Sequence, residues 1–303
     1  MRFSIPAHAV VVDVFGGLGN QMFQYAAGKA LAKRLCCDLR INAAGLSADA
    51  LREYSLGCFA LPDPVEALAP ESGNQNGNHG SQRNIHRGLR KVFRRLLAKN
   101  ATDGLVSEPS FHYWDGIEGI ASPGVRLHGY WQSPRYFAHF ESQLRKLFTF
   151  ADMSVRARQL ADTIKSAPSV GIHVRRRDYL NPEVAAVHGS CSPDYYHKAY
   201  ALIRGLCPEC RVFVFSDDVP AAKQLFDAWP NAHFVEGHTQ EEDMYLISSC
   251  SYHIIANSSF SWWGAWLAGD GSRQVVAPRA WFTPAHLRTK NTTDLFPPSW
   301  ILV

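Results

Sequence analysis

From about residue 165 to the C-terminus, the sequence alternates between short apolar segments and longer amphipathic ones. The apolar segments at 169–175, 211–216, 232–237, 251–257 and 273–278 predict strands, and the segments at 192–206, 219–229, 241–250 and 259–269 predict helices. Strands that alternate with helices over about a hundred residues indicate βαβ units and a parallel sheet. We therefore expect this half of the chain to fold as an α/β domain.

The start of the chain holds another strand–helix unit. AVVVDVF (9–15) predicts a buried strand, GGLGNQ (16–21) a glycine-rich turn, and residues 22–35 a helix. Met22 stands where a dinucleotide-binding fingerprint needs its third glycine, which argues against an NAD enzyme. A length of 303 residues predicts two domains, at roughly 150 residues per domain. We place them at 1–155 and 156–303.

Composition and charge exclude several classes of protein. Hydrophobic residues make up 46% of the chain and charged residues 19%, which is ordinary for a globular protein. These values rule out disorder, collagen or a coiled coil as descriptions of the whole chain. Lys plus Arg (31) exceeds Asp plus Glu (27) by a net charge of only +4, which is too mild for a nucleic-acid binder.

Apolar runs and cysteines indicate a cytoplasmic location. No run reaches the roughly 18 apolar residues of a membrane-spanning helix, and Asp13 interrupts the apolar N-terminal run, which argues against a secretory signal. Seven cysteines at irregular spacing favour a reducing compartment over a disulfide framework. The lone Cys207–Cys210 pair is expected to be inert rather than a zinc or redox site.

The segment 71–100 differs from the rest of the chain. Residues 71–82 are polar and aperiodic, which predicts a loop, and 83–100 predict a helix with one apolar face and a strongly basic remainder. Two interpretations of this helix stay open. It packs on the core with a solvated basic face, or it lies on an anionic membrane surface through residues 83–99.

Three polar clusters directly follow predicted strands: HVRRRD (173–178), SDD (216–218) and NSSFS (257–261). In an open parallel sheet, ligands bind beyond the carboxyl ends of the strands. We therefore expect these clusters, although far apart in sequence, to share one edge of one sheet and to form one site.

The first cluster is suited to a diphosphate. Arg175 and Arg176 are consecutive cations at a strand end, and Asp178 follows. A guanidinium group matches two phosphate oxygens in a bidentate fork. The alternative is an exposed basic turn in which Asp178 neutralises the arginines.

The other two clusters support the same site. Ser258, Ser259 and Ser261 open a predicted helix, and the free N–H groups and dipole of a helix N-terminus favour phosphate. The alternative is plain capping by serine. Asp217 and Asp218 can bind sugar hydroxyls or base nitrogens, or they cap the helix at 219.

Five segments, in order along the chain, resemble the alpha-1,2-fucosyltransferase family. They are GGLGNQMFQYAAGKALA (16–32), HGYWQSPRYF (128–137), IHVRRRDYL (172–180), VFSDD (214–218) and ANSSFSWWGAWLA (256–268). The resemblance covers most of the chain but not 71–100. It implies an α/β fold of two facing Rossmann-like domains, the GT-B type of glycosyltransferase. The acceptor would bind mainly to 1–155 and the nucleotide sugar to 156–303.

The resemblance also implies a reaction. The enzyme would move L-fucose from GDP-L-fucose to the 2-hydroxyl of a galactose in a glycan, with inversion and without a metal ion or other cofactor. Two alternatives stay open: an inverting fucosyltransferase of another linkage, and a non-catalytic protein that binds glycans or nucleotide sugars. The expected acceptor is a galactose-containing oligosaccharide or a lipid-linked glycan, which would bring the helix at 83–99 to the inner face of the membrane.

The family motif HxRRxD assigns roles on the donor side. It places His173 near the guanine nucleoside and Arg175 and Arg176 on the pyrophosphate, with Asp178 orienting the arginines. We take Arg175, Arg176 and Asp178 as catalytic, because charge develops on the departing GDP. Arg177 departs from the family, which usually has glycine there.

Further donor residues follow from the resemblance. Ser259, Phe260 and Ser261, with Ser258 before them, resemble the segment that lines the phosphates and fucose. Asp243 resembles an acid that binds guanine, and Asp218 is the donor-side candidate of the SDD cluster.

On the acceptor side, the resemblance places Asn20 and Gln21 at the acceptor cleft. In HGYWQSPRYF, the candidates to stack on sugar faces are Tyr130, Trp131 and Tyr136, and those to meet hydroxyls are Gln132 and Arg135. Core packing at the domain junction is the alternative.

The sequence does not identify a catalytic base. Asp13 is a candidate because it lies close to the glycine turn, but a structural role is favoured for it and for the histidines His112 and His128.

Overall fold

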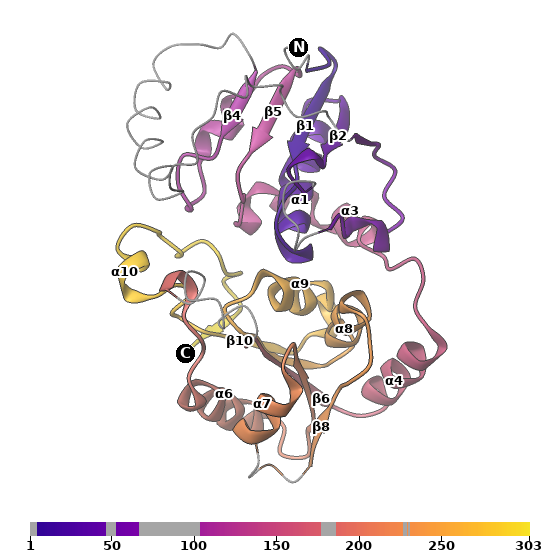
Figure 1. The fold of residues 1–303 in the computed structure, drawn as a ribbon, viewed down its shortest axis with the longest axis vertical. Helices are drawn as coiled ribbons and strands as arrows, with labels where there is room; N and C mark the ends of the chain where they lie inside the picture. Colours follow the sequence, from indigo (N-terminus) through magenta and orange to yellow (C-terminus); the bar gives the residue numbers. More distant parts are fainter. Residues whose placement is uncertain (1–4, 47–52, 67–103, 177–185, 227–228, 230) are drawn as a thin grey trace, which may run out of the picture.

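The computed structural model describes residues 5–46, 53–66, 104–176, 186–226, 229 and 231–303, and the structural statements below concern these residues. They form two halves, each built around a parallel sheet, which lie one above the other in Figure 1. The loop predicted at 71–82, the basic helix predicted at 83–100, and Arg177 and Asp178 lie outside the described residues.

The sheet of the N-terminal half has the strand order β3-β2-β1-β5-β4. The bounds are β1 Ala9–Asp13, β2 Asp38–Asn42, β3 Val65–Glu66, β4 Leu105–Ser107 and β5 Val125–His128. All neighbouring pairs are parallel. β1 is buried at every position, as expected for an inner strand with an apolar sequence.

Helix α1 (Leu18–Arg34) follows β1 and begins earlier than the predicted start at residue 22. The turn takes only Gly16, in a left-handed conformation at φ +74°, and Gly17, which is the N-cap. GGLGNQ is rich in turn-forming residues, so its local pattern favours a longer loop. Tertiary packing outweighs that preference, because Leu18, Gly19 and Gln21 are all buried in the first helical turn.

The sheet of the C-terminal half has the order β11-β10-β9-β6-β7-β8. The bounds are β6 Ser169–Val174, β7 Arg211–Ser216, β8 Ala232–Phe234, β9 Tyr252–Ile254, β10 Gln274–Ala277 and β11 Ile301–Leu302. Every neighbouring pair is parallel, as the strand–helix alternation predicts. The sequence analysis missed β11, a two-residue edge strand without an apolar run long enough to recognise.

The connecting helices match the predicted ones within a few residues. They are α6 Pro193–Leu206, α7 Val219–Leu225, α8 Gln240–Ser248 and α9 Ser259–Leu267. Ser192 caps α6, since its side chain accepts a hydrogen bond from the Tyr195 N–H. None of the described helices has both the length and the apolar character needed to cross a bilayer.

The remaining helical segments lie at the junction and the periphery. They are α3 Glu141–Leu147, α4 Val155–Lys165, α10 Pro284–Leu287 and the 3-10 segments η1 Ala44–Leu46, η2 Leu56–Cys58, η4 Asp115–Gly119, η5 Pro134–Tyr136, η6 Ala138–Phe140 and η8 Gly269–Gly271. In Figure 1, α3 lies with the N-terminal half and α4 with the C-terminal half. The chain therefore passes between the halves just before α4.

Each sheet has a topological switch point, where successive connections lead to opposite sides of the sheet. In the N-terminal sheet, β2 and β3 extend to one side of β1 and β5 and β4 to the other, so the switch lies between β1 and β5. In the C-terminal sheet, the switch lies between β6 and β9. Open α/β sheets bind ligands outside the carboxyl ends of the strands at such a switch point. The fold thus offers one candidate site on each sheet.

The two halves meet through an aromatic core. Phe23 on α1 has its ring centroid 4.6 Å from that of Trp262 and 4.9 Å from that of Trp263, both on α9. Phe137 stacks on Trp263 at 5.4 Å. One hydrophobic cluster therefore includes buried residues of both halves. The apolar sequence of α9 follows from this position, because the helix is covered by its own sheet and by the other half.

The closest approach of the halves is at Gly19. A Cβ atom at this position would lie 2.4 Å from the backbone carbon of Ser259. Such a contact involves the backbone of α9, so a small side-chain movement cannot relieve it. The first turns of α1 and α9 are therefore in direct backbone contact, and only glycine fits.

Replacing this glycine should separate the two helices. We expect Gly19→Ala to lower the free energy of unfolding by about 1–3 kcal/mol, the usual cost of overpacking, and to lower Tm in thermal unfolding followed by circular dichroism. Gly205→Ala on α6 is the matched control, because nothing lies within 4 Å of its Cβ position. The control should hold or raise Tm. Equal Tm values for the Gly19 variant and the wild type would contradict the backbone contact.

Candidate functional site

The predicted site on the C-terminal sheet lies where β6 and β9 end. Arg175 directly follows β6, and Ser258 is the N-cap of α9, which follows β9. Nη1 of Arg175 donates a hydrogen bond of 3.0 Å to Oγ of Ser258. Two clusters that are 83 residues apart in sequence are thus in contact, as their positions at the ends of neighbouring strands predict. A guanidinium group and a helix N-terminus point to an anionic ligand.

Ser258 does not cap its helix with its side chain. Its hydroxyl accepts from Arg175 instead, and Ser261 Oγ is buried and donates to the Ser258 carbonyl at 3.3 Å. The first N–H groups of any helix have no acceptor within the helix. Plain serine capping therefore does not account for this cluster.

His173 lies one position before the end of β6 and is buried. Burial, with a smaller effect of the nearby Arg175 charge, lowers the pKa of His173 to about 3, so the imidazole is neutral at physiological pH. Its Nδ1 has no hydrogen-bond partner among the described residues. Its ring lies 5.5 Å from that of Phe260 on α9. A neutral, unpartnered ring nitrogen can bind a donor or an acceptor of a ligand.

Arg176 and the SDD cluster are linked through the backbone. The Arg176 side chain is exposed, and its N–H donates to Oδ1 of Asp217 at 2.7 Å. Asp218 is the N-cap of α7, because its Oδ1 accepts from the Ala221 N–H at 3.1 Å. Of the two roles that the sequence left open for these aspartates, the structure shows the capping role for Asp218. Asp217 holds the end of the β6 loop.

The pKa values of Asp243 and its neighbour Glu242, on the first turns of α8, are shifted in opposite directions. Hydrogen bonds from Ser154 and Thr239 overcome burial and lower the pKa of Glu242 to about 2. Burial, with the negative charges of Glu242 and Glu241, raises the pKa of Asp243 to about 7. No described residue donates a hydrogen bond to the Asp243 carboxylate. It is therefore the carboxylate in this region that a ligand could most readily satisfy.

Asn20 connects the two halves next to the Gly19 contact. Its Oδ1 accepts a hydrogen bond from Ser259 Oγ at 2.7 Å and another from Gln132 Nε2 at 2.8 Å. The structure therefore brings together two predicted acceptor residues, Asn20 and Gln132, with a predicted donor residue. The sequence analysis did not foresee that Ser259 binds across the junction.

Gln21 was predicted to face the acceptor, and the structure shows otherwise. Its side chain is fully buried. Nε2 donates to the carbonyls of Gly16 and Glu53, each at 2.8 Å, and Oε1 accepts from the Ser55 N–H at 2.9 Å. Its hydrogen-bonding groups are thus used to attach α1 to the neighbouring loop, and none remains directed at a ligand.

The prediction that Trp131 stacks on a sugar is also wrong. Trp131 is fully buried in the core, packs edge-on against Tyr136 at 5.3 Å, and adopts φ +55°. Tyr130, its neighbour, is the exposed aromatic residue, at 42%. Strand alternation does not apply in this turn, so the sequence could not show which aromatic side chain faces outwards.

The sequence analysis missed Glu108, which holds this turn in place. Its carboxylate accepts the N–H groups of Tyr130 at 2.8 Å and Trp131 at 3.0 Å. Burial outweighs these two bonds and raises the pKa of Glu108 to about 7. Its position directly after a strand was the available signal, but β4 is too short to be recognised from its sequence.

Asp13 is buried and fully engaged, as the structural role favoured for it predicts. Its carboxylate binds Asn42 at 2.6 Å, Arg126 at 2.8 Å and His128 at 2.8 Å. These residues come from β2 and β5, on either side of β1. Asp13 thus lies at the switch point of the N-terminal sheet.

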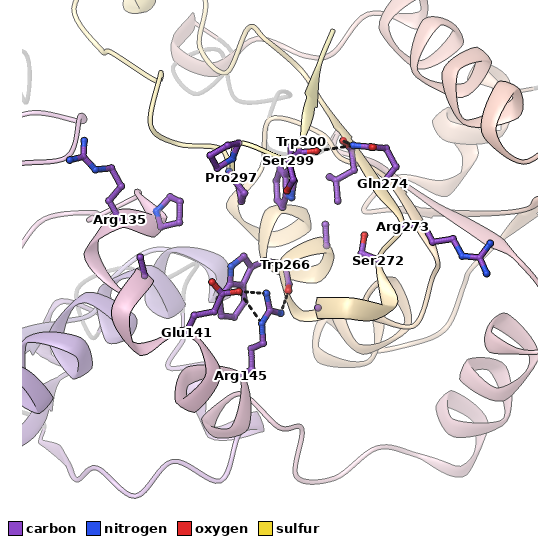
Figure 2. A pocket seen from close by; sticks show the side chains of 16 residues that line it. Arg135, Glu141, Arg145, Trp266, Ser272, Arg273, Gln274, Pro297, Ser299 and Trp300 are labelled. Atoms are coloured by element: carbon purple, nitrogen blue, oxygen red, sulfur yellow. Dashed lines mark hydrogen bonds and ion pairs between the residues drawn. The ribbon is translucent and has the colours of Figure 1, made fainter.

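Two cavities lie between the halves but away from Arg175 and Ser258. Figure 2 shows one of 410 Å³, which touches Gln274, the first residue of β10, and so lies at the amino ends of the C-terminal strands. In it Arg145 is bound to Glu141 and to the Trp266 carbonyl, while Arg135 and Arg273 point outwards. Of these three arginines, only Arg145 points inwards, and its guanidinium group is already engaged by protein acceptors.

The other cavity, of 620 Å³, carries mostly negative charge. Its lining includes the carboxylates of Glu53, Asp152, Glu241 and Glu242. A diphosphate would be repelled there. Within the described residues, no group of three or more His, Cys, Asp or Glu side chains is arranged to hold a metal ion.

Comparison with known proteins identifies relatives along the whole chain. The family model described as "Glycosyl transferase family 11" matches residues 120–303. An alpha-1,2-colitosyltransferase from Escherichia coli is 34% identical and covers 97% of this chain and 98% of that protein. The O-antigen biosynthesis glycosyltransferase WbnK from Escherichia coli is 30% identical over 94% of this chain and 97% of that protein. A galactoside alpha-(1,2)-fucosyltransferase 2 from Oryctolagus cuniculus is 26% identical over 86% and 75%.

The unpaired carboxylate of Asp243 should make stability depend on pH. Its pKa in the folded protein, about 7, exceeds the ordinary value of 3.8, so the folded state binds the proton more tightly and stability falls as pH rises between these values. We expect Asp243→Asn to raise Tm, and to raise it more at pH 8 than at pH 5. The exposed Asp162 on α4 is the matched control, and Asp162→Asn should change Tm equally at both pH values. A larger gain for Asp243→Asn at pH 5 would contradict the raised pKa of this half-buried carboxylate.

Proposed function

Because this chain belongs to glycosyl transferase family 11, we propose that it transfers L-fucose from GDP-L-fucose to the 2-hydroxyl of a galactose in a glycan. A fucosyl-type glycosyltransferase is the class to which its relatives belong. The single observation that carries the proposal is the contact between Arg175 and Ser258 at the switch point of the C-terminal sheet. It joins a guanidinium group to a helix N-terminus, where a sugar diphosphate would bind.

The donor diphosphate would bind between the end of β6 and α9. Arg175 is already oriented by Ser258, and Arg176 follows on a loop held by Asp217. When the bond from the anomeric carbon to the diphosphate breaks, negative charge develops on GDP. Positioned cations and helix N–H groups stabilise such charge. This arrangement supports transfer without a metal ion.

The guanine base would bind near His173 and Asp243. Guanine presents N–H donors on its N1 and N2 edge, and a carboxylate pairs with both. Asp243 lacks a donor among the described residues, and binding guanine would compensate the cost of its ionisation. The neutral His173 ring, next to Phe260, would contact the nucleoside. The proposal thus uses two polar groups of this half that lack a hydrogen-bond partner among the described residues.

The acceptor would bind to the N-terminal half across from the donor. Asn20 and Gln132 lie beside Ser259 at the junction of the halves. Tyr130, which precedes Gln132 by two positions, has an exposed side chain. An acceptor hydroxyl held there would reach the anomeric carbon from the side opposite the leaving diphosphate. Attack from that side inverts the anomeric configuration.

A second donor is favoured by one comparison. A colitosyltransferase is 34% identical to the chain, and colitose is the 3-deoxy derivative of L-fucose. A site that hydrogen-bonds the 3-hydroxyl of fucose would discriminate strongly against colitose, whereas an apolar site would discriminate weakly against fucose. The preferred donor is therefore identified by the ratio of kcat/KM for GDP-fucose to kcat/KM for GDP-colitose, and the fold is the same for both.

The reaction is tested by product analysis with matched donors and acceptors. Purified protein is incubated with GDP-fucose or GDP-colitose and with galactose-terminated oligosaccharides, and NMR determines the linkage and anomeric configuration of the product. The proposal expects fucose linked to the 2-hydroxyl of galactose, with activity retained in EDTA. Another linkage would favour the other-linkage alternative. Glycan binding without transfer from any GDP-sugar would favour a binding protein.

A variant of Arg175 tests whether this side chain binds the donor diphosphate during transfer. Arg175→Lys keeps a positive charge but loses the fork that binds two oxygens, so we expect kcat/KM for transfer to fall at least about 100-fold. Arg158→Lys, on the exposed face of α4, is the matched control and should keep the wild-type rate. Circular dichroism and Tm check that both variants are folded. Unchanged transfer by the Arg175 variant would place the diphosphate elsewhere.

A further inference from the structure

An aspartate–histidine pair occupies the switch point of the N-terminal sheet. Oδ2 of Asp13, the last residue of β1, lies 2.8 Å from Nδ1 of His128, the last residue of β5. The Asp13 side chain is 7% exposed, whereas that of His128 is 54% exposed. The pair therefore joins a fixed, buried carboxylate to an imidazole that a ligand can reach.

The other contacts of Asp13 determine the state of the pair. Oδ1 accepts hydrogen bonds from Arg126 and Asn42. Burial raises the pKa of Asp13, but the bonds from His128, Arg126 and Asn42 outweigh it and leave the pKa below its ordinary value. An ionised carboxylate only accepts hydrogen bonds, so Nδ1 of His128 carries the proton in this bond. In the neutral ring, Nε2 then keeps a free lone pair.

Nε2 of His128 has no hydrogen-bond partner among the described residues. The ring of Phe15 lies 5.5 Å from the His128 ring and 5.1 Å from the exposed ring of Tyr130. Aromatic faces next to a free acceptor nitrogen fit a sugar, which has apolar C–H faces and hydroxyl donors. The surroundings of the pair are therefore those of a sugar hydroxyl site.

The pair lies next to the junction with the donor half. Phe15 precedes Gly16, and a Cβ atom at Gly16 would lie 2.7 Å from the Asn20 side chain. Asn20 in turn binds Ser259 at the start of α9. In Figure 1, β5 ends on the side of its sheet that faces the C-terminal half. The aspartate–histidine pair and the Arg175–Ser258 contact thus belong to facing edges of the two sheets.

Two other groups at this edge are less suited to accept a proton. Both oxygens of Glu108 are used by the backbone N–H groups of Tyr130 and Trp131. His112 lies 2.9 Å from Asp294, but its Nδ1 is buried and makes no hydrogen bond of good geometry. His128 combines an exposed imidazole with a hydrogen-bonded carboxylate.

We propose that His128 is the catalytic base that accepts the proton of the acceptor hydroxyl, and that Asp13 is its positioning residue. This inference rests on the proposed glycosyl transfer. The hydroxyl oxygen forms a bond to the anomeric carbon as the bond from that carbon to the diphosphate breaks, and GDP leaves with that electron pair. The hydroxyl proton moves to Nε2, and the imidazolium formed releases it to water. Asp13 stabilises the imidazolium and keeps Nε2 directed at the acceptor.

The test separates proton transfer from donor activation. His128→Asn keeps an amide that can donate to Asp13 but has no nitrogen at the Nε2 position. We expect its kcat for transfer to fall about 100-fold or more, the usual contribution of a general base, with the acceptor KM changed less than threefold. Hydrolysis of the GDP-sugar in the absence of acceptor should continue at the wild-type rate, because the donor half is intact. In His128→Ala, added imidazole should restore part of the transfer rate.

His139 provides the matched control. It is an exposed histidine on η6 of the same half, and His139→Gln should keep both transfer and hydrolysis. Wild-type kcat in His128→Asn, or a loss that appears only in the acceptor KM, would overturn the base assignment and leave the proposed function standing. Equal losses of transfer and of donor hydrolysis would also overturn it, because they indicate a general structural defect. A wild type that transfers from no GDP-sugar would overturn both proposals.

Discussion

The backbone contact between the first turns of α1 and α9 determines how the two halves face each other. At 2.4 Å from a Ser259 backbone atom, a Cβ at position 19 has no room, so glycine is required there. The aromatic rings of Phe23, Trp262 and Trp263 bury the surroundings of this contact. Since each helix follows the inner strand of its own sheet, the contact brings both switch points to one junction. The hydrogen bond between Asn20 and Ser259 across the junction depends on that arrangement.

Two carboxylates removed from full solvent contact, Asp13 and the half-buried Asp243, differ in how many hydrogen bonds they receive. Asp13 has three hydrogen-bond donors and a lowered pKa, whereas Asp243 has two acidic neighbours and a raised pKa. A buried charge costs free energy unless it is paired. The protein therefore carries a stability cost at Asp243, and such a cost is typical of a position that a ligand completes. Asp13, by contrast, is held in place by its three hydrogen bonds, as expected of a side chain that orients its neighbour.

Much of the C-terminal half could be predicted from the sequence alone. Buried parallel strands are short apolar runs and the helices between them carry capping residues, so periodicity located β6, β7 and β9 and the helices around them. The contact of Arg175 with Ser258 also follows from topology, because neighbouring parallel strands end at the same edge. The N-terminal half was harder to predict. Residues 128–137 form an irregular turn, in which neither strand nor helix periodicity shows that Trp131 is buried and Tyr130 exposed.

The sequence by itself determined the α/β class, the order of strands and helices in the C-terminal half, the presence of polar clusters at the ends of its strands and the resemblance to alpha-1,2-fucosyltransferases. These properties are local, since they depend on periodicity and on residue types at strand ends. Only the tertiary structure decided that Gln21 anchors a loop, that Ser259 binds Asn20 across the junction and that Asp13 orients His128. Such roles depend on which groups from distant segments meet, and in each case one side chain can satisfy either a buried neighbour or a ligand. Its own sequence position does not distinguish the two.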